Sequence, residues 1–303
     1  MKDGSDRDGG GGNDRGSGEG DGIGGRDDIG VGSSVIHLED GVWKVNDTGF
    51  EVSVMDRGLM YGDGVFETVR CYDGVPAFPG RHFDRLKRAA KELDIPLDSK
   101  LGRDGFDAAI EKAVNSVGGG DVYFRLTATR GFREGLLSPT ETEPTVFAVA
   151  KPLDRRLYPP ASVEVVEARR PIGPESRHKT LNYLPNVRAK AETEGDEALM
   201  RDADGNIASG AVSNIFAVDG DVTVTPYSYV RRGVTREVVL DIARDLGYSV
   251  ETKPLDSPNS YDGFFLTNTT WGVRPVKEFE GREIEKPNIV DQIKRRYLDQ
   301  VTS

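Results

Sequence analysis

One lysine stands in a setting that could let it act as a nucleophile. Lys179 lies in the segment 178–183, HKTLNY, which we expect to follow a strand and to precede a helix. A lysine nucleophile must lose its proton for part of the time, and burial or a neighbouring cation lowers its pKa toward that state. Most lysines are solvated surface groups, so this segment alone does not identify a site.

Two further segments could bind a phosphate group. The segment 233–236, GVTR, opens a predicted helix, where free backbone N–H groups and the Thr235 hydroxyl could bind an anion. The segment 266–270, LTNTT, brings hydroxyl groups to the end of a predicted buried strand. A plain threonine cap and a capped turn are the alternative interpretations. Together, the three segments suit a protein that holds a phosphorylated cofactor beside a reactive amine.

The elements that must position these segments form two units in the sequence. Alternating or continuous apolar runs predict strands at 42–45, 51–54, 65–72, 122–129, 145–151 and 163–168. Helical spacing of apolar residues predicts helices over about 82–93, 106–117, 184–194 and 235–246. We therefore predict a mixed α+β (α/β) fold of two domains. A small N-terminal α/β domain spans 34–152, a proline-containing linker spans 153–162, and a larger β-rich domain with flanking helices spans 163–303.

The composition limits the classes of function. The glycine-rich, acidic segment 1–33 cannot bury enough apolar surface to offset its ordering entropy, so we predict a disordered tail. A formal net charge of -11 argues against nucleic-acid and membrane partners, which both require clustered positive charge. Cys71 is the only cysteine and the histidines show no ligand spacing, so we expect no disulfide and no metal site. We predict a cytoplasmic protein that acts on a small amino substrate.

The order and spacing of eight short segments resemble the class IV aminotransferases, a pyridoxal 5'-phosphate (PLP) dependent family also called fold type IV. The resemblance covers nearly all of 35–280. It rests on DRG at 56–58, YGDGVFET at 61–68, HFDRL at 82–86, KTLNY at 179–183, DEAL at 196–199, SNIF at 213–216, GVTR at 233–236 and FLTNT at 265–269. It implies a two-domain fold type IV enzyme with PLP as cofactor. It also implies a homodimer, with each active site near the subunit contact.

The resemblance also implies roles for individual residues. Lys179 would bind PLP as a Schiff base and then move the α-proton of the substrate as general acid and base. Tyr183 would bind the phenolic oxygen of PLP. The remaining cofactor-binding residues, most of them around the phosphate, would be Arg85, Ser209, Val234, Thr235, Asn268 and Thr269. On the substrate side, Arg130 would bind a carboxylate, and Phe66 and Trp271 would line the pocket.

One departure from the family pattern concerns Ser209. The family usually has a glutamate there, which keeps the pyridine nitrogen of PLP protonated and makes the ring an electron sink. A serine hydroxyl can only form a hydrogen bond. Transamination depends on the sink more strongly than β-elimination, because in elimination the electrons leave with the departing group. Ser209 therefore favours elimination.

These residues leave three hypotheses for the function. The first is a lyase that converts 4-amino-4-deoxychorismate to 4-aminobenzoate and pyruvate for folate synthesis. The second is an aminotransferase for branched-chain or D-amino acids that uses 2-oxoglutarate and glutamate, in which another group or a water serves the ring nitrogen. The third is a non-enzymatic protein that retains the fold for binding or regulation, against which the intact Lys179, Arg85 and Thr235 argue.

Overall fold

A computed structural model describes residues 33–46, 49–132, 137, 142–154, 158–255 and 258–302. Almost all of the predicted tail at 1–33, and part of the predicted linker at 153–162, lie outside the described residues. None of the described helices is long and apolar enough to cross a membrane.

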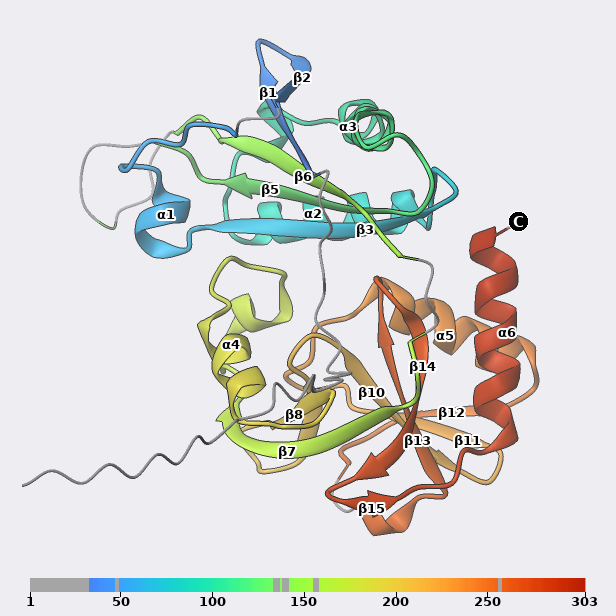
Figure 1. The fold of residues 1–303 in the computed structure, drawn as a ribbon. Helices are drawn as coiled ribbons and strands as arrows, with labels where there is room; N and C mark the ends of the chain where they lie inside the picture. The colour runs from blue at the N-terminus through green and yellow to red at the C-terminus, as the bar shows by residue number, and fades with distance from the viewer. Residues whose placement is uncertain are drawn as a thin grey trace, which may run out of the picture.

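The N-terminal half forms a six-stranded sheet with two helices packed against it (Figure 1). The strand order is β2-β1-β6-β5-β3-β4. The strands are β1 (Ser34–Glu39), β2 (Val42–Asn46), β3 (Gly64–Tyr72), β4 (Val75–Pro76), β5 (Val122–Thr129) and β6 (Val146–Pro152). The helices are α1 (Arg57–Tyr61), α2 (Pro79–Glu92), η1 (Leu97–Ser99) and α3 (Arg103–Ser116). Apolar side chains of α2 and α3, among them Phe83 and Phe106, share one core with Phe124 of β5.

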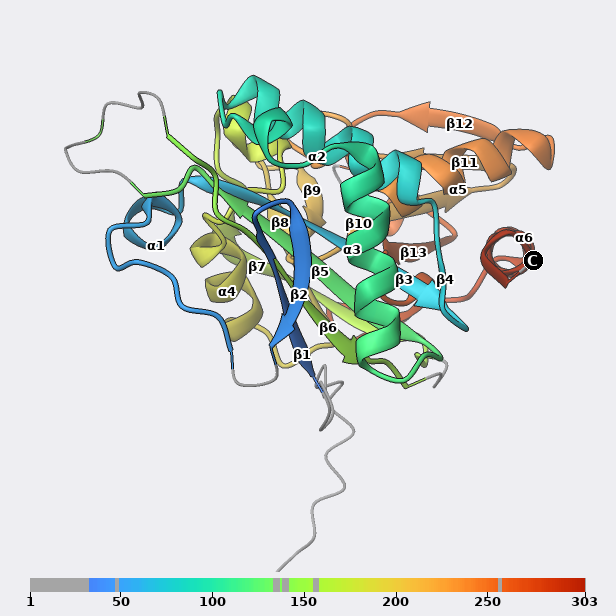
Figure 2. The ribbon, with the colours of Figure 1, turned by 90° about the horizontal axis from the view of Figure 1, so that it is seen from above.

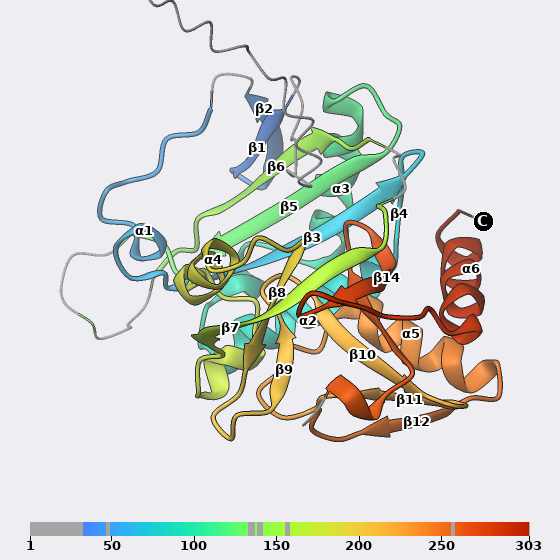
Figure 3. The same ribbon diagram turned by 60° about the horizontal axis from the view of Figure 1, so that its bottom comes forward.

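The C-terminal half forms a nine-stranded sheet with three longer helices around it (Figures 2 and 3). The order is β12-β11-β10-β13-β14-β7-β8-β9, and β15 pairs with β14. The strands are β7 (Ala161–Arg169), β8 (Glu197–Arg201), β9 (Ile207–Gly210), β10 (Asn214–Asp219), β11 (Val222–Thr225), β12 (Ser249–Thr252), β13 (Gly263–Asn268), β14 (Gly272–Phe279) and β15 (Arg282–Glu283). The helices are η2 (Pro174–Arg177), α4 (Leu184–Ala191), α5 (Val234–Asp245), η3 (Pro258–Ser260) and α6 (Asn288–Thr302).

The predicted fold class is confirmed, with two differences in the elements. The segment 51–54 is not a strand, because the Asp56 amide donates to the Ser53 carbonyl oxygen at 2.9 Å and the chain turns into α1. Val54 is consequently exposed instead of facing a core. The sequence analysis also did not predict α6, whose buried Ile289, Ile293 and Tyr297 follow helical spacing.

Two sets of hydrogen bonds join the halves at the point where the candidate lysine lies. The Phe66 amide donates to the Lys179 carbonyl oxygen at 2.8 Å, and the Leu181 amide donates to the Gly64 carbonyl oxygen at 3.0 Å. The segment after η2 is therefore held along β3 of the other half. Gly64 is required there, because a Cβ atom would lie 2.7 Å from the side chain of Leu181 and 2.8 Å from the Ala128 carbonyl oxygen.

Candidate active site

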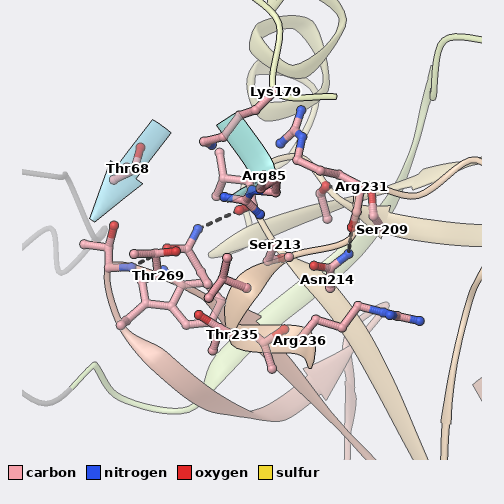
Figure 4. Close-up of a pocket in the computed structure, with 18 of the residues that line it drawn as sticks. Thr68, Arg85, Lys179, Ser209, Ser213, Asn214, Arg231, Thr235, Arg236 and Thr269 are labelled. Atoms are coloured by element: carbon pink, nitrogen blue, oxygen red, sulfur yellow. Dashed lines mark hydrogen bonds between the residues drawn. The ribbon is translucent and has the colours of Figure 1, made fainter. Parts of the chain in front are cut away.

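A pocket lies where the two sheets meet, and both halves of the chain contribute to its wall (Figure 4). The small domain contributes residues of β3, α2 and β5, which are Phe66, Thr68, Arg85, Tyr123 and Arg125. The larger domain contributes Arg170, Lys179, Tyr183, Ser209, Gly210, Val212, Ser213, Asn214, Arg231, Gly233, Val234, Thr235, Arg236 and 267–271. The structure thus brings together every predicted site residue except Arg130.

Lys179 presents an unpaired amine to this pocket. Its Nζ lies 4.1 Å from the ring centroid of Phe66, and no described residue forms an ion pair or hydrogen bond with it. Burial lowers the pKa of Lys179 to about 8; the neighbouring Arg231 acts in the same direction and Tyr183 opposes it. A neutral amine is therefore accessible near neutral pH, as a nucleophilic lysine requires.

Tyr183 lies in a strongly positive environment. Its hydroxyl oxygen accepts a hydrogen bond from Arg231 Nη1 at 2.8 Å, and its ring packs edge-on against Phe66 at 5.2 Å between centroids. Burial acts to raise the pKa of Tyr183, but the charges of Lys179 and Arg231, together with Arg170, outweigh it and lower the pKa to about 7. The same positive charges would stabilise a phenolic oxygen anion of a ligand beside Tyr183.

The N-terminus of α5 supplies backbone donors to the opposite side of the pocket. Gly233 is the N-cap residue, and none of the described side chains caps the helix, so the first N–H groups keep free hydrogen-bonding capacity. Thr269 lies near Thr235 across this wall (Figure 4). Thr267 Oγ1 is buried at the pocket wall with no hydrogen-bond partner among the described residues. Such an arrangement suits an anionic ligand.

Arg85 reaches the pocket from α2 with two of its nitrogens already engaged by Glu67. Its Nε and Nη2 donate to the two carboxylate oxygens of Glu67 at 2.7 and 2.8 Å, and its Nη1 donates to the Arg232 carbonyl oxygen at 3.1 Å. His82 Nδ1 lies 2.8 Å from the same carboxylate. A guanidinium has five N–H donors, so Arg85 retains two for a ligand while its orientation is fixed.

Asn268 and Ser209 make local hydrogen bonds at the pocket wall. Asn268 Nδ2 donates to the Val212 carbonyl oxygen at 2.6 Å, and its Oδ1 accepts from the Thr270 amide at 2.7 Å. Ser209 is 3% exposed, and its hydroxyl donates to the Gly210 carbonyl oxygen at 3.0 Å. In this structure Asn268 therefore shapes the wall, and Ser209 offers it only a hydroxyl oxygen.

Arg130 does not line the pocket, contrary to the role predicted for it. Its Nε donates to Asp63 at 2.8 Å, and its Nη1 and Nη2 donate to the carbonyl oxygens of Asp94 and Leu93 at 2.5 and 2.7 Å. The residue is 7% exposed. Because all three nitrogens hold the small domain together, Arg130 has a structural role in this conformation.

The sequence analysis missed three arginines that the structure places in the pocket, namely Arg125, Arg170 and Arg231. Arg125 lies opposite Thr68 in the β3–β5 register, and its Cζ lies 3.7 Å above the Phe66 ring centroid. No described residue forms an ion pair or hydrogen bond with its guanidinium. Alternation along 122–129 could have revealed that Tyr123 and Arg125 share one face of β5.

These residues fit PLP. An unpaired amine, a phenol held by an arginine, free helix N-terminal amides and an orphaned threonine hydroxyl are the groups that PLP's aldehyde, phenolic oxygen and phosphate require. Lys179 would bind the cofactor covalently. Val234, Thr235, Thr269 and Arg85 would hold its phosphate.

Comparisons with known proteins agree with this geometry. Residues 64–279 match the family model described as amino-transferase class IV. A Methanocaldococcus jannaschii protein, provisionally named branched-chain-amino-acid aminotransferase, is 36% identical over 272 residues, which cover 84% of this chain and 93% of the relative. The aminodeoxychorismate lyase of Bacillus subtilis is 30% identical over 241 residues, covering 76% of this chain and 82% of that protein.

Solved structures show the same fold. The branched-chain aminotransferase of the thermophilic archaeon Thermoproteus uzoniensis, solved with norvaline, has a TM-score of 0.80 at 27% identity and covers 88% of this chain and 94% of its own. A second branched-chain amino acid aminotransferase, from T.th., was solved as a complex with N-(5'-phosphopyridoxyl)-L-glutamate. It has a TM-score of 0.80 at 26% identity and covers 89% of this chain and 94% of its own.

Proposed function

Since the chain belongs to the class IV aminotransferase family and is therefore a PLP-dependent enzyme, we propose that it transfers the amino group of an amino acid to a 2-oxo acid. When bound, PLP supplies an electron sink for the negative charge that develops at the substrate α-carbon. The substrates that we propose are branched-chain amino acids, with 2-oxoglutarate as the amino acceptor. The similarity to two branched-chain aminotransferase structures supports this choice.

The observation that carries the proposal is the pairing of an apolar and a cationic group beside Lys179. Phe66 and Trp271 offer apolar surface, while the guanidinium of Arg125 has no acidic partner among the described residues. Lys179 Nζ and Arg125 Cζ lie within 4.1 and 3.7 Å of the same Phe66 centroid. An aminotransferase must accept two side chains in one site, and this wall suits both an aliphatic side chain and a carboxylate.

The chain's own residues divide the work of the reaction. Lys179 holds the cofactor and, as a neutral amine, removes the proton from the substrate α-carbon. Arg231 holds Tyr183, and with Arg170 it keeps positive charge beside the cofactor's phenolic oxygen. Phe66 covers the amine of Lys179 and limits its contact with water, which preserves the lowered pKa.

A second candidate is the conversion of 4-amino-4-deoxychorismate to 4-aminobenzoate and pyruvate. Ser209 favours it, because position 209 carries a hydroxyl instead of a carboxylate and an elimination depends less on the electron sink. The similarity to the B. subtilis lyase supports the same candidate. Arg125 does not separate the two reactions, because aminodeoxychorismate also carries carboxylates.

Product analysis of PLP-reconstituted protein tests both candidates. One sample receives a branched-chain amino acid with 2-oxoglutarate, and the other receives aminodeoxychorismate. Glutamate in the first sample supports the aminotransferase, whereas pyruvate with 4-aminobenzoate in the second supports the lyase and overturns our first proposal if the first sample stays blank. Lys179→Ala serves as the inactive control in both samples.

A further inference from the structure

Glu197 is a buried carboxylate that the reaction described above does not use. It begins β8 and is 2% exposed. Its Oε2 accepts a hydrogen bond from the Ser213 hydroxyl at 2.8 Å, and its Oε1 accepts from the amides of Ala198 and Ala211 at 3.0 and 3.2 Å. No described lysine, arginine or histidine lies within ion-pair distance of it. Burial raises its pKa, and the Ser213 hydrogen bond opposes that effect.

This carboxylate lies directly behind the pocket wall. Ser209, Gly210 and Ser213 all line the pocket, and Figure 4 shows Ser209 and Ser213 on the same side of it. A Cβ atom at Gly210 would lie 2.1 Å from Ser213 Oγ and 2.8 Å from the Glu197 carboxyl carbon. The glycine therefore lets the carboxylate approach the wall at the place where Ser209 supplies no acid.

The Ser213 hydroxyl can connect Glu197 to the pocket. A hydroxyl has one donor and two acceptor sites, and the donor of Ser213 is used on Glu197. The acceptor sites remain, and donation to a carboxylate strengthens them, because hydrogen bonds in a chain polarise one another. A ligand N–H that donates to Ser213 would then lie two hydrogen bonds from a negative charge.

We propose that Glu197, acting through Ser213, supplies the carboxylate that position 209 lacks and keeps the pyridine nitrogen of PLP protonated. The inference rests on the proposed function, since it assumes PLP in this pocket. Glu197 is a positioning residue, because only Ser213 would contact the cofactor. The electron sink is then retained despite Ser209, which removes the chemical objection to transamination.

The test is ¹⁵N NMR of the protein reconstituted with PLP labelled at the ring nitrogen, titrated across pH. We expect a protonated ring nitrogen in the unmodified protein. In Glu197→Gln the carboxylate charge is lost while the side-chain volume is kept, so the pH at which the nitrogen loses its proton should fall by about 1 to 3 units. Identical titrations of the two proteins would overturn the proposal.

Three further variants separate a specific role from a structural one. Ser213→Ala should reproduce the fall in the titration midpoint, and Ser213→Thr, which keeps the hydroxyl, should restore most of it. Glu164→Gln is the matched control, because Glu164 also accepts from a hydroxyl, that of Thr193 at 2.6 Å, but does not line the pocket. If Ser209→Ala moves the midpoint and Ser213→Ala does not, Ser209 serves the nitrogen and the proposal is wrong.

The readout does not depend on which reaction the enzyme performs. A shifted midpoint in Glu197→Gln without any aminotransferase product in the unmodified protein would sink the proposed function and leave this inference standing. Glutamate production with an unmoved midpoint would have the opposite meaning. Should Glu197→Gln fail to fold by circular dichroism, the Ser213 pair of variants decides the outcome.

Discussion

The two ends of the pocket are built by different means. At the end beside α5, backbone amides and short hydroxyl side chains from 233–235 and 267–269 do the binding. At the end beside β5, long side chains of the small domain, above all Arg125 over Phe66, project across a sheet. The first end depends on where one helix begins. The second depends on the register of two strands that are far apart in the sequence.

This difference explains why one arginine was assigned wrongly. Arg125 and Arg130 lie five positions apart, and the sequence alone presents both as strand residues with a positive charge. The structure engages Arg130 with Asp63 and two carbonyl oxygens, while the guanidinium of Arg125 stays unpaired among the described residues. A charged group that already has its partners is part of the fold, whereas one without them is available to a ligand.

The largest effect expected comes from Lys179, which lies between the two ends. Lys179→Ala should lose about 10³-fold or more of the activity, because general acid–base catalysis alone contributes about 10² to 10⁴. Borohydride reduction followed by mass spectrometry should find PLP attached to the unmodified protein and not to the variant. Lys91→Ala, at an exposed position of α2, is the control. Retained attachment in Lys179→Ala would show that another amine binds the cofactor.

The comparison of the two arginines can be broken by a pair of substitutions. Arg125→Ala should raise KM for 2-oxoglutarate by about 10- to 100-fold, the equivalent of one charge-assisted hydrogen bond, with little change in the unfolding free energy. Arg130→Ala should leave KM nearly unchanged and cost about 3 kcal/mol of stability, because Asp63 and two carbonyl oxygens lose a buried partner. Steady-state kinetics and urea unfolding of both variants distinguish these outcomes. The reverse pattern would return the substrate role to Arg130.

At the α5 end, Thr267→Val isolates a single hydroxyl. Its Oγ1 is buried without a partner among the described residues, so its removal should leave the cofactor-free protein as stable or slightly more stable. PLP affinity should fall about 5- to 10-fold, which corresponds to roughly 1 kcal/mol for one hydrogen bond. Equilibrium dialysis and thermal melting of the cofactor-free protein measure the two quantities. Unchanged affinity would mean that this hydroxyl does not meet the cofactor.

The smallest effect expected is a shift in the pH at which Lys179 captures PLP. A negative charge on Tyr183 favours the protonated lysine and raises its pKa. Tyr183→Phe removes that charge, so the pKa of Lys179 should fall below about 8 and the rate of PLP capture should reach half its maximum at a lower pH. Stopped-flow absorbance across about pH 6 to 9, a window that brackets the lysine pKa of about 8, follows the capture. A midpoint that rises instead would mean that loss of the tyrosine exposes the lysine to water.

The sequence predicted the parts of this molecule that are contiguous in the chain. The lysine segment, the start of α5 and the strand over 122–129 could be found because each is set by local pattern. The roles of Arg125, Arg231 and Glu197 could not, because each depends on neighbours more than ten residues away, brought close by strand pairing or loop packing. The homodimer, the cytoplasmic location and the domain bounds remain predictions.

The hydrogen bonds between β3 and the lysine segment have a consequence for how the enzyme is made. Thr180 pairs with Val65, 115 positions earlier in the chain, so the reactive amine reaches its place only after both halves have condensed. Contacts of such wide separation form late, because closing the loop between them costs entropy first. The apoenzyme should therefore gain its affinity for the cofactor in the last phase of refolding, well after most of its helical signal has returned.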